Sequence, residues 1–247
     1  MFRFGLIVVL AALAMPASAD TIFGIYAGAA TWQQQASGDV TAGVSELDVE
    51  DDLGVDDDDN NVFYVAIEHP IPLLPNIRLQ HTDISLVGDN LLSRNIEFNG
   101  TVFTLSEQVN TDLELTQADA VLYYELLDNY VSLDLGLAAR WVDGFVRVNS
   151  TLASAEAEFS GVIPLLYAKA RVDLPLSGLW VGAQVQGLAY DGDQLVDANA
   201  QIGWESDLGL GVELGYRSFS LELEEFDEVD TAKIDIDGVY FGLTFHF

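Results

Sequence analysis

The sequence predicts an all-β protein, a closed antiparallel transmembrane β-barrel of about ten strands (8–12). Apolar residues recur at every second position in many segments, which is the period of a strand with one apolar face. Short turns and longer polar loops alternate between these segments, as they do in membrane barrels. No later segment approaches the roughly 20 apolar residues of a spanning helix, so any membrane span must be made of strands.

Composition limits the function classes. The 247 residues suffice for one barrel or sandwich domain. The chain has no Cys, which excludes disulfides and thiolate chemistry. A formal charge of −31 with only nine Lys plus Arg argues against nucleic-acid binding, because phosphate contacts need basic groups. Hydrophobic residues make up 50% of the chain, so the acidity does not indicate disorder.

The N-terminus has the features of a secretory signal peptide. Arg3 forms a short positive region, Phe4–Met15 an apolar region, and Ala17–Ser18–Ala19 an A-x-A cleavage site. The apolar region has about 12 residues, too few for a spanning helix. We therefore expect residues 1–19 to be removed and residues 20–247 to form the barrel domain.

Three strands are expected in the first third of the domain. Residues 21–34 alternate, with glycines on the face that we place inward. Residues 35–61 hold ten acids and no base, which predicts a long solvated loop. The strand 62–69 follows, and a turn over 69–76, fixed by three prolines, leads into the strand 77–82.

The middle of the chain contains the clearest pair of strands. Residues 88–111 are polar with a weak strand signal near 96–105, and we interpret them as a second long loop containing a hairpin that extends past the membrane. Residues 118–126 and 131–141 then alternate strictly around a tight turn at 127–129. A soluble sheet could show this pattern, but its apolar face would need a second sheet to cover it.

The last part of the chain repeats this layout. Alternation predicts strands over 162–172, 179–190, 198–205, 210–217 and 239–247. Short turns are expected at 173–178 and 206–209, and acidic or polar loops at 149–158, 191–196 and 222–230. The last strand has large apolar residues at alternate positions and ends on Phe247. An even number of strands puts both termini on the periplasmic side.

The two faces of these strands differ in composition. The expected inward face collects small residues: Gly24, Gly28, Gly136, Gly182, Gly203, Gly211, Gly215 and Gly242. The outward face is nearly free of charge. Candidates for interfacial aromatic girdles are Trp141 on the outer side and Tyr124, Trp204 and Phe247 on the periplasmic side. The alternative is a soluble β-sandwich or a lipocalin-like periplasmic barrel, which would need more cover than this chain supplies.

Four features resemble an uncharacterised proteobacterial family of small outer-membrane β-barrel proteins. They are the signal peptide, the turn His69–Asn76, the strand Pro164–Arg171 and the end Leu243–Phe247. The resemblance covers essentially the whole mature chain. It implies a barrel in the outer membrane, in contact with its lipids and assembled by the barrel assembly machinery, with Phe247 as the recognition signal. It implies no reaction, ligand or cofactor.

Charged residues of the inward parity form the first candidate site. The basic ones are Arg78, Arg140, Lys169, Arg171 and Arg217, and the acidic ones are Glu68, Asp119, Glu125, Asp134, Glu205 and Glu213. They favour a salt-bridged plug, because charges away from water must be paired. The alternative is a constriction along a thin polar pathway for a small solute.

The acid run Glu50–Asn61 is a second candidate. The carboxylates of Asp52, Asp56, Asp57, Asp58 and Asp59 lie close together around Gly54, and Ca²⁺ prefers six to eight oxygen ligands. The spacing does not match an EF-hand loop. The pattern favours a solvated anionic loop that faces the medium, so a weak divalent-ion site is the secondary hypothesis and no metal is assigned.

Enzymatic activity is not expected. His69 lies at a periplasmic turn, His81 has the lipid-facing parity and His246 is next to the C-terminus. None lies near an expected extracellular loop, and no G-x-S-x-G or H-E-x-x-H motif occurs. Two functions therefore stay open: a narrow channel or binding barrel for a small solute, and a non-conducting structural barrel that contributes to envelope integrity or surface charge.

Overall fold

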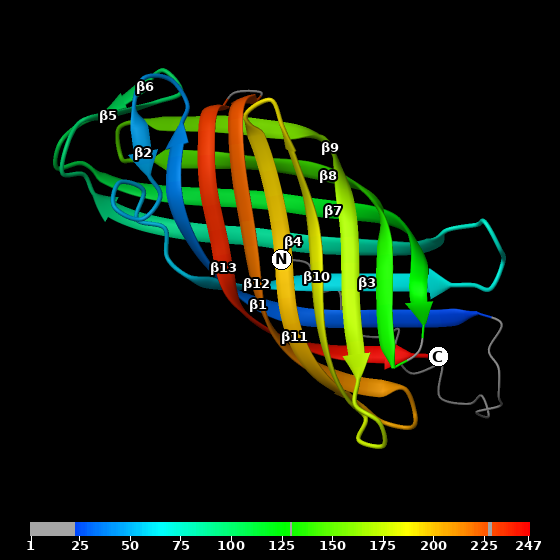
Figure 1. The fold of residues 1–247 in the computed structure, drawn as a ribbon. Coiled ribbons are helices and arrows are strands. Elements are labelled where there is room, and N and C mark those ends of the chain that lie inside the picture. The colour runs from blue at the N-terminus through cyan, green and yellow to red at the C-terminus, as the bar shows by residue number, and fades with distance from the viewer. Residues whose placement is uncertain (1–22, 129, 227–228) are drawn as a thin grey trace, which may run out of the picture.

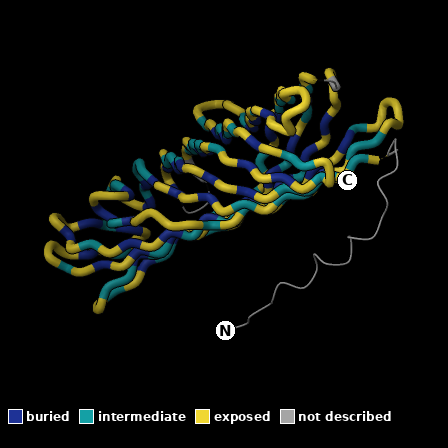
Figure 2. The backbone as a smooth tube through the Cα atoms, turned by 90° about the horizontal axis from the view of Figure 1, so that it is seen from below, coloured by how far each residue is buried: buried dark blue, intermediate teal, exposed yellow. Residues whose placement is uncertain are grey.

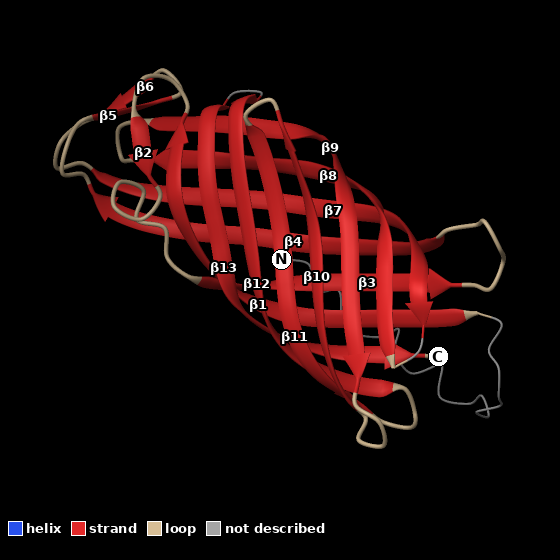
Figure 3. Ribbon diagram, viewed as in Figure 1, coloured by secondary structure: helices blue, strands red, loops and turns tan. Residues whose placement is uncertain are grey.

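The computed structural model describes residues 23–128, 130–226 and 229–247. Within these residues the chain forms a closed antiparallel barrel of ten strands, β1, β3, β4 and β7–β13, each paired with its neighbours along the sequence (Figure 1). The predicted fold class is confirmed. The described residues contain no helix long and apolar enough to cross a membrane. The strands are drawn in red in Figure 3.

The strands are longer than the alternation predicts. Their bounds are β1 Gly24–Thr41, β2 Glu46–Asp48, β3 Asp58–Glu68, β4 Asn76–Leu91, β5 Ile96–Phe98, β6 Thr101–Phe103, β7 Gln108–Asp128, β8 Val131–Asn149, β9 Ser154–Asp173, β10 Leu179–Tyr190, β11 Asp193–Glu205, β12 Leu210–Phe226 and β13 Val229–His246. The three short strands β2, β5 and β6 lie together at one end of the barrel, away from the C-terminus (Figure 1). We call this the cap end, and the opposite end the turn end.

The last strand closes the barrel against the first. The register of β13 on β1 runs from His246 opposite Tyr26 to Thr231 opposite Thr41. Phe247 continues the ladder beyond β13: its N–H donates to the carbonyl of Ile25 at 2.9 Å, and the Ile25 N–H donates back at 2.8 Å. The C-terminal strand therefore pairs with the first strand along most of its length, as a closed barrel requires.

The predicted loops at the cap end need correction. Much of the predicted loop 35–61 belongs to β1, β2 and β3, and the ends of 88–111 belong to β4 and β7. The predicted loop 149–158 shrinks to residues 150–153, and the described residues of 222–230 belong to β12 and β13. The hairpin expected near 96–105 is present as β5 and β6. Some acids that suggested solvated loops, such as Asp39 and Asp59, lie instead on the outer faces of strands that run further than predicted. The acids from Glu50 to Asp57 stay in the connection between β2 and β3.

In the half of the barrel next to the turn end, apolar side chains point outward. Leu79 of β4, Leu137 of β8 and Leu243 of β13 are 46%, 64% and 60% exposed. The four expected girdle residues, Trp141, Tyr124, Trp204 and Phe247, are exposed as well. The stretch 239–247 measures about 27 Å at about 3.4 Å per residue, comparable with the ~25 Å apolar band of membrane barrels. We call this outward apolar surface the belt.

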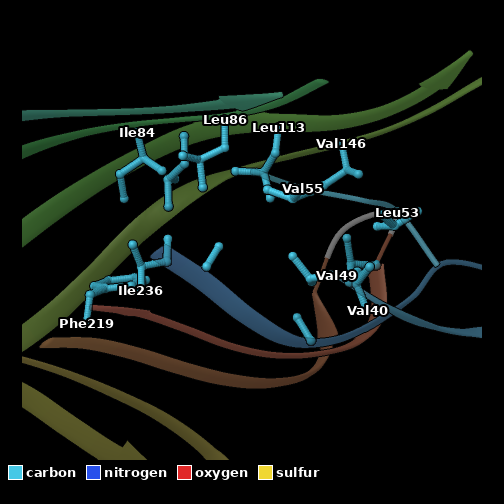
Figure 4. Packing of buried hydrophobic residues seen from close by; sticks show 14 of the residues in the cluster. Val40, Val49, Leu53, Val55, Ile84, Leu86, Leu113, Val146, Phe219 and Ile236 are labelled. Atoms are coloured by element: carbon cyan, nitrogen blue, oxygen red, sulfur yellow. The ribbon is translucent and has the colours of Figure 1, made fainter. Parts of the chain in front are cut away.

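In the half next to the cap end, the polarity of the two faces is reversed. Inward positions hold one continuous core of buried apolar residues. Ile84 and Leu86 of β4 and Leu113 of β7 face Phe219 of β12 and Ile236 of β13 across the lumen (Figure 4). The outward positions here carry an acidic collar: Asp39, Asp59, Asp83, Asp112, Glu114, Asp143, Glu156, Glu158, Glu222, Asp235 and Asp237. Buried and exposed residues alternate along these strands (Figure 2).

The segments between the long strands close the cap end. Leu47 of β2, Leu53, Phe98 of β5 and Phe103 of β6 are fully buried and extend the apolar core. Hydrogen bonds hold them on the barrel: Thr111 Oγ1 donates to the Leu53 carbonyl at 2.9 Å. The Asn99 side chain donates to the Glu156 carbonyl of β9 at 2.6 Å.

The wall is incomplete between β9 and β10. Their ladder ends at Leu166 opposite Gly187, although β9 continues back to Ser154 beside β8. Pro164 lies on β9, two residues past Leu166 toward the cap end. Proline has no N–H to donate, which is tolerated here because this edge of β9 has no partner strand. The short β10–β11 hairpin consequently leaves a notch in the cap half of the wall.

Candidate functional site

The lumen at the boundary between the two halves contains four charged side chains linked into a chain. Arg140 of β8 donates from Nε and Nη2 to both oxygens of Asp119 on β7, at 2.7 Å each. Its Nη2 also donates to Asp197 of β11 at 2.7 Å. Arg217 of β12 donates from Nε and Nη2 to the same Asp197 at 2.8 and 2.7 Å. The chain thus joins β7, β8, β11 and β12 across the barrel.

All four side chains are almost completely buried. Side-chain exposure is 0% for Arg140, 2% for Asp119, 5% for Asp197 and 4% for Arg217. Further polar groups surround them: Gln186 donates to Asp119 at 3.1 Å, and Arg217 donates to Thr82 at 3.3 Å. Burying charge is tolerated only when each group is paired and hydrogen-bonded. We call Asp119, Arg140, Asp197 and Arg217 the ion-pair bridge.

Trp32 lies between the bridge and the polar part of the lumen. Its indole is fully buried on β1, with the Arg217 guanidinium 4.5 Å from the ring centroid. A cation over an aromatic face is stabilised by the ring quadrupole, and more so where water is excluded. The bridge, Trp32 and the apolar core beyond them therefore close the lumen over most of the cap half.

Between Trp32 and the turn end lies a polar cavity of about 80 Å³. Its lining includes Arg78, Lys169, Arg171, Arg217, Glu205, Glu213 and the rings of five tyrosines and two tryptophans. At ~10–15 Å³ for each water, this volume holds roughly five to eight water molecules. Charged side chains become more exposed toward the turn end, from 4% at Arg217 to 22% at Arg171. The cavity is therefore reached from the turn end.

Inward glycines make room for the cavity's aromatic rings. A Cβ on Gly28 would lie 2.2 Å from the Tyr64 ring, and one on Gly203 would lie 2.3 Å from the Trp180 ring. A Cβ on Gly215 would lie 2.4 Å from the Tyr240 ring. Each ring thus fills the space of a missing side chain on the neighbouring strand, which explains why glycine recurs at the inward parity.

Most charges on the cavity wall have a partner. Lys169 lies 3.7 Å from Asp134, and Arg171 lies 2.8 Å from Asp173 and 3.6 Å from Glu205. The other charged groups near the turn end accept hydrogen bonds: Glu68 from Tyr123, Glu125 from Asn76, and Glu205 from His246. The His246 ring also stacks on Tyr26 at 4.1 Å. These contacts fix the side chains around the cavity mouth.

Two buried charges on the cavity wall have no ion pair. Arg78 of β4 stacks on Tyr64 at 3.8 Å and donates to Gln80 at 3.0 Å, but its buried Nε has no acceptor. Glu213 of β12 is 6% exposed. Within the described residues, neither has an oppositely charged group within 4.0 Å, and Glu213 has no hydrogen-bond partner.

The structure places the residues predicted for a luminal network at two levels. Arg140, Asp119 and Arg217 belong to the ion-pair bridge, and the others line the cavity or its mouth. Asp197, which joins the two arginines, was not among the predicted luminal residues, because the strand predicted over 198–205 begins one residue after it. Asp197 lies two residues before Asn199 and four before Gln201, so it shares their inward face, and this alternation could have identified it.

The acid run Glu50–Asn61 was the candidate calcium site, and its carboxylates lie in different surroundings in the structure. Asp52 is buried and accepts a hydrogen bond from Arg94 Nε at 3.1 Å, which raises the pKa of Arg94 above its ordinary value. Asp57 is exposed and accepts from Gln35, while Asp58 and Asp59 begin β3. Within the described residues, no three His, Cys, Asp or Glu side chains are grouped to hold a metal ion. The calcium site stays a hypothesis.

The three histidines lie apart from one another. His69 contacts the Pro75 carbonyl at 3.2 Å in a turn, and His246 contacts Glu205. His81 is on the outward face at the edge of the belt, 3.0 Å from Asp83. The predicted signal peptide lies outside the described residues, and the assembly role of Phe247 stays a prediction.

Comparisons with known proteins identify the fold and leave the family open. No family model and no curated protein matches the sequence. The solved outer-membrane protease OmpT from Escherichia coli matches with a TM-score of 0.54 and 12% identity over 91% of this chain and 96% of that chain. The translocator domain of autotransporter NalP from Neisseria meningitidis matches with a TM-score of 0.47 and 10% identity over 91% and 88%. The fold is therefore that of outer-membrane β-barrels.

Proposed function

We propose that the chain is an integral outer-membrane barrel whose lumen is closed and does not conduct solutes. The apolar core of the cap half carries this proposal. An ion or polar solute crossing it would lose its hydration without gaining polar partners, which is strongly unfavourable. Hydrophobic constrictions close channels by the same effect. Of the two functions left open by the sequence, these features favour the non-conducting barrel over the narrow channel.

The proposal places the turn end in the periplasm and the cap end outside the cell. Membrane barrels have short periplasmic turns, and the C-terminus lies at the turn end. The acidic collar would then stand above the membrane in the medium, while the belt faces lipid. The barrel would present a rigid, strongly anionic structure at the cell surface, held by an apolar core of its own.

We assign the barrel no reaction. The likeness to a protease concerns the fold, and at 12% identity it carries no residue of that enzyme's site to this chain. The His81–Asp83 pair lies on the outside of the wall, where His81 borders an open, largely apolar hollow beside the belt. Peptide cleavage by the purified barrel that is lost in His81→Ala would contradict this part of the proposal.

Planar-bilayer recording of the refolded barrel tests the closed lumen. The wild type is expected to give no stepwise current, and Arg140→Ala and Arg217→Ala are expected to stay silent because the apolar core is unchanged. A water-filled porin incorporated in the same bilayer serves as the positive control. Stepwise wild-type currents, altered by either substitution, would show a pathway and overturn the proposal.

A further inference from the structure

We propose that the polar cavity binds a small zwitterion, with the ligand's anionic group on Arg78 and its ammonium group facing Glu213. The inference concerns only the cavity on the turn-end side of Trp32. It requires no passage through the barrel, so it stands or falls independently of the closed lumen.

Arg78 supplies the anion-binding group. It is 9% exposed, and stacking on Tyr64 fixes its guanidinium plane. Its Nη2 donates to Gln80, whereas its Nε is buried without an acceptor. A buried guanidinium without a carboxylate within 4.0 Å is costly, and its planar fork matches a carboxylate or phosphate in two-point contact. The geometry thus leaves donors available for an anion inside the cavity.

Glu213 supplies the complementary group. It lines the same cavity from β12. In the ring of ten strands, β12 is four strands away from β4, with β3, β1 and β13 between them. The two unpaired charges therefore stand on nearly opposite walls. Every other charged side chain on the lining has an oppositely charged partner within 4.0 Å: Lys169 with Asp134, Arg171 with Glu205, and Arg217 with Asp197.

This charge balance favours a zwitterion over a simple anion. An anion on Arg78 would leave Glu213 buried without a partner and would be repelled by it. A molecule carrying both charges satisfies both walls and leaves the cavity neutral. The five to eight waters that it would displace correspond to roughly as many heavy atoms, the size of a small amino acid. The tyrosine rings between the walls suit its methylene groups.

Calorimetric titration of the folded barrel in detergent tests the inference. The probes are glycine, β-alanine, 4-aminobutyrate and 5-aminovalerate, which differ in the distance between amine and carboxylate. Butyrate and butylamine carry one charge each. We expect at least one amino acid to bind with a Kd at least tenfold below those of both single-charge probes. Heats indistinguishable from dilution for every amino acid, or butyrate bound as tightly as the best one, would overturn the inference.

Substitutions locate the binding. Arg78→Gln and Glu213→Gln should each raise the Kd of the best probe at least tenfold, whereas Arg147→Gln, on a cap-half pair with Glu156, should leave it unchanged. Folding of each variant is checked by heat-modifiable electrophoretic mobility. If one cavity variant fails to fold, the other and the wild-type probe series decide. Unchanged affinity in a folded cavity variant would remove that residue from the site and overturn the inference.

The same chemistry occurs in free amino acids and in a zwitterionic lipid headgroup, so phosphoethanolamine is titrated beside the amino acids. Binding of phosphoethanolamine tenfold tighter than that of the best amino acid would assign the site to a headgroup. The reverse order would assign it to a free solute, which the position of the cavity inside the wall favours. If the bilayer recordings show no current and no probe binds, only this inference is overturned. If currents appear and a probe binds, only the proposal of a closed lumen is overturned.

Discussion

Asp197 at the centre of the lumen shows how single residues hold the barrel together. One carboxylate accepts three hydrogen bonds, one from Arg140 and two from Arg217, at 2.7–2.8 Å, and its side chain is 5% exposed. Paired burial of this kind is roughly neutral when complete, but removing one partner strands the others. The residue therefore matters chiefly because its loss would leave the buried guanidinium groups of Arg140 and Arg217 without their shared carboxylate.

Asp197→Ala should destabilise the barrel by about 3–5 kcal/mol, because it leaves two buried guanidinium groups without their shared carboxylate. Urea unfolding of the barrel in lipid vesicles, followed by tryptophan fluorescence, measures the change. Asp173→Ala is the matched control, because it removes a partner of Arg171 in a partly exposed pair, worth roughly 0–1 kcal/mol. Equal losses in the two variants would contradict the role of Asp197.

Sequence reasoning reached the parity of the luminal charges but not their pairing. Alternation within a strand fixes which side chains share a face, so three of the four bridge residues and the charged residues of the cavity wall were predicted to face the lumen. Asp197 was not among them. Which charges meet depends on the stagger between strands, which no local pattern shows. The partners of Arg171, at Asp173 and Glu205, and the absence of one for Arg78 follow only from the register.

At the scale of the element, strands that extend into the cap half, such as β4 and β13, change the phase of their apolar residues where they leave the belt. In β13, Val239, Phe241 and Leu243 point outward, whereas Ala232 and Ile236 point inward. In β4 the outward Leu79 gives way to the inward Ile84. In the part of a strand that crosses the membrane, lipid covers outward apolar side chains. In the part that stands in water, only the lumen can bury apolar side chains, so they must point inward there.

This change of phase explains why the sequence analysis ended the strands too early. The cap-half residues still alternate, but their polar positions hold carboxylates, and that acidity suggested solvated loops. The apolar residues that alternate with these carboxylates indicate that the strands continue. On β9 they are Ala155, Ala157 and Phe159, and on β12 they are Phe219 and Leu221. The turn ends were predicted more closely because prolines and glycines mark them directly.

Deleting Phe247 should reduce the amount of assembled barrel in the outer membrane severalfold. The residue completes the ladder to Ile25 and, by resemblance, carries the assembly signal. Heat-modifiable mobility and outer-membrane fractionation measure the loss. Deletion of Leu152, which is 84% exposed in the β8–β9 connection, is the matched control and should have little effect. If the barrel without Phe247 inserts as well as the control, the role is wrong.

At the scale of the molecule, the barrel consists of two coaxial parts with opposite polarity. One has an apolar outside and a polar lumen with the cavity; the other has an acidic outside and an apolar core. Because the second part is packed like a soluble protein, it can stand above the membrane without lipid around it. This arrangement predicts both a closed lumen and a defined orientation.

The orientation predicts that Asp57→Cys is accessible at the cell surface. Asp57 is exposed at the cap end beside β3, and the chain has no other Cys. A membrane-impermeant maleimide should label this variant in intact cells as strongly as in broken cells. Leu208→Cys, in an exposed connection at the turn end, should be labelled only after the cells are broken. The opposite pattern would invert the proposed topology.

The most direct test of the two-part barrel compares adjacent positions on β13. Ile236 is 1% exposed in the apolar core, whereas Asp237 points outward in the acidic collar. We measure the rate at which a hydrophilic maleimide modifies Ile236→Cys and Asp237→Cys in the folded barrel. A dry core predicts rapid modification of Asp237→Cys and none of Ile236→Cys until the barrel is unfolded. Equal rates in the folded state would mean that water fills the cap half, and the lumen would not be closed.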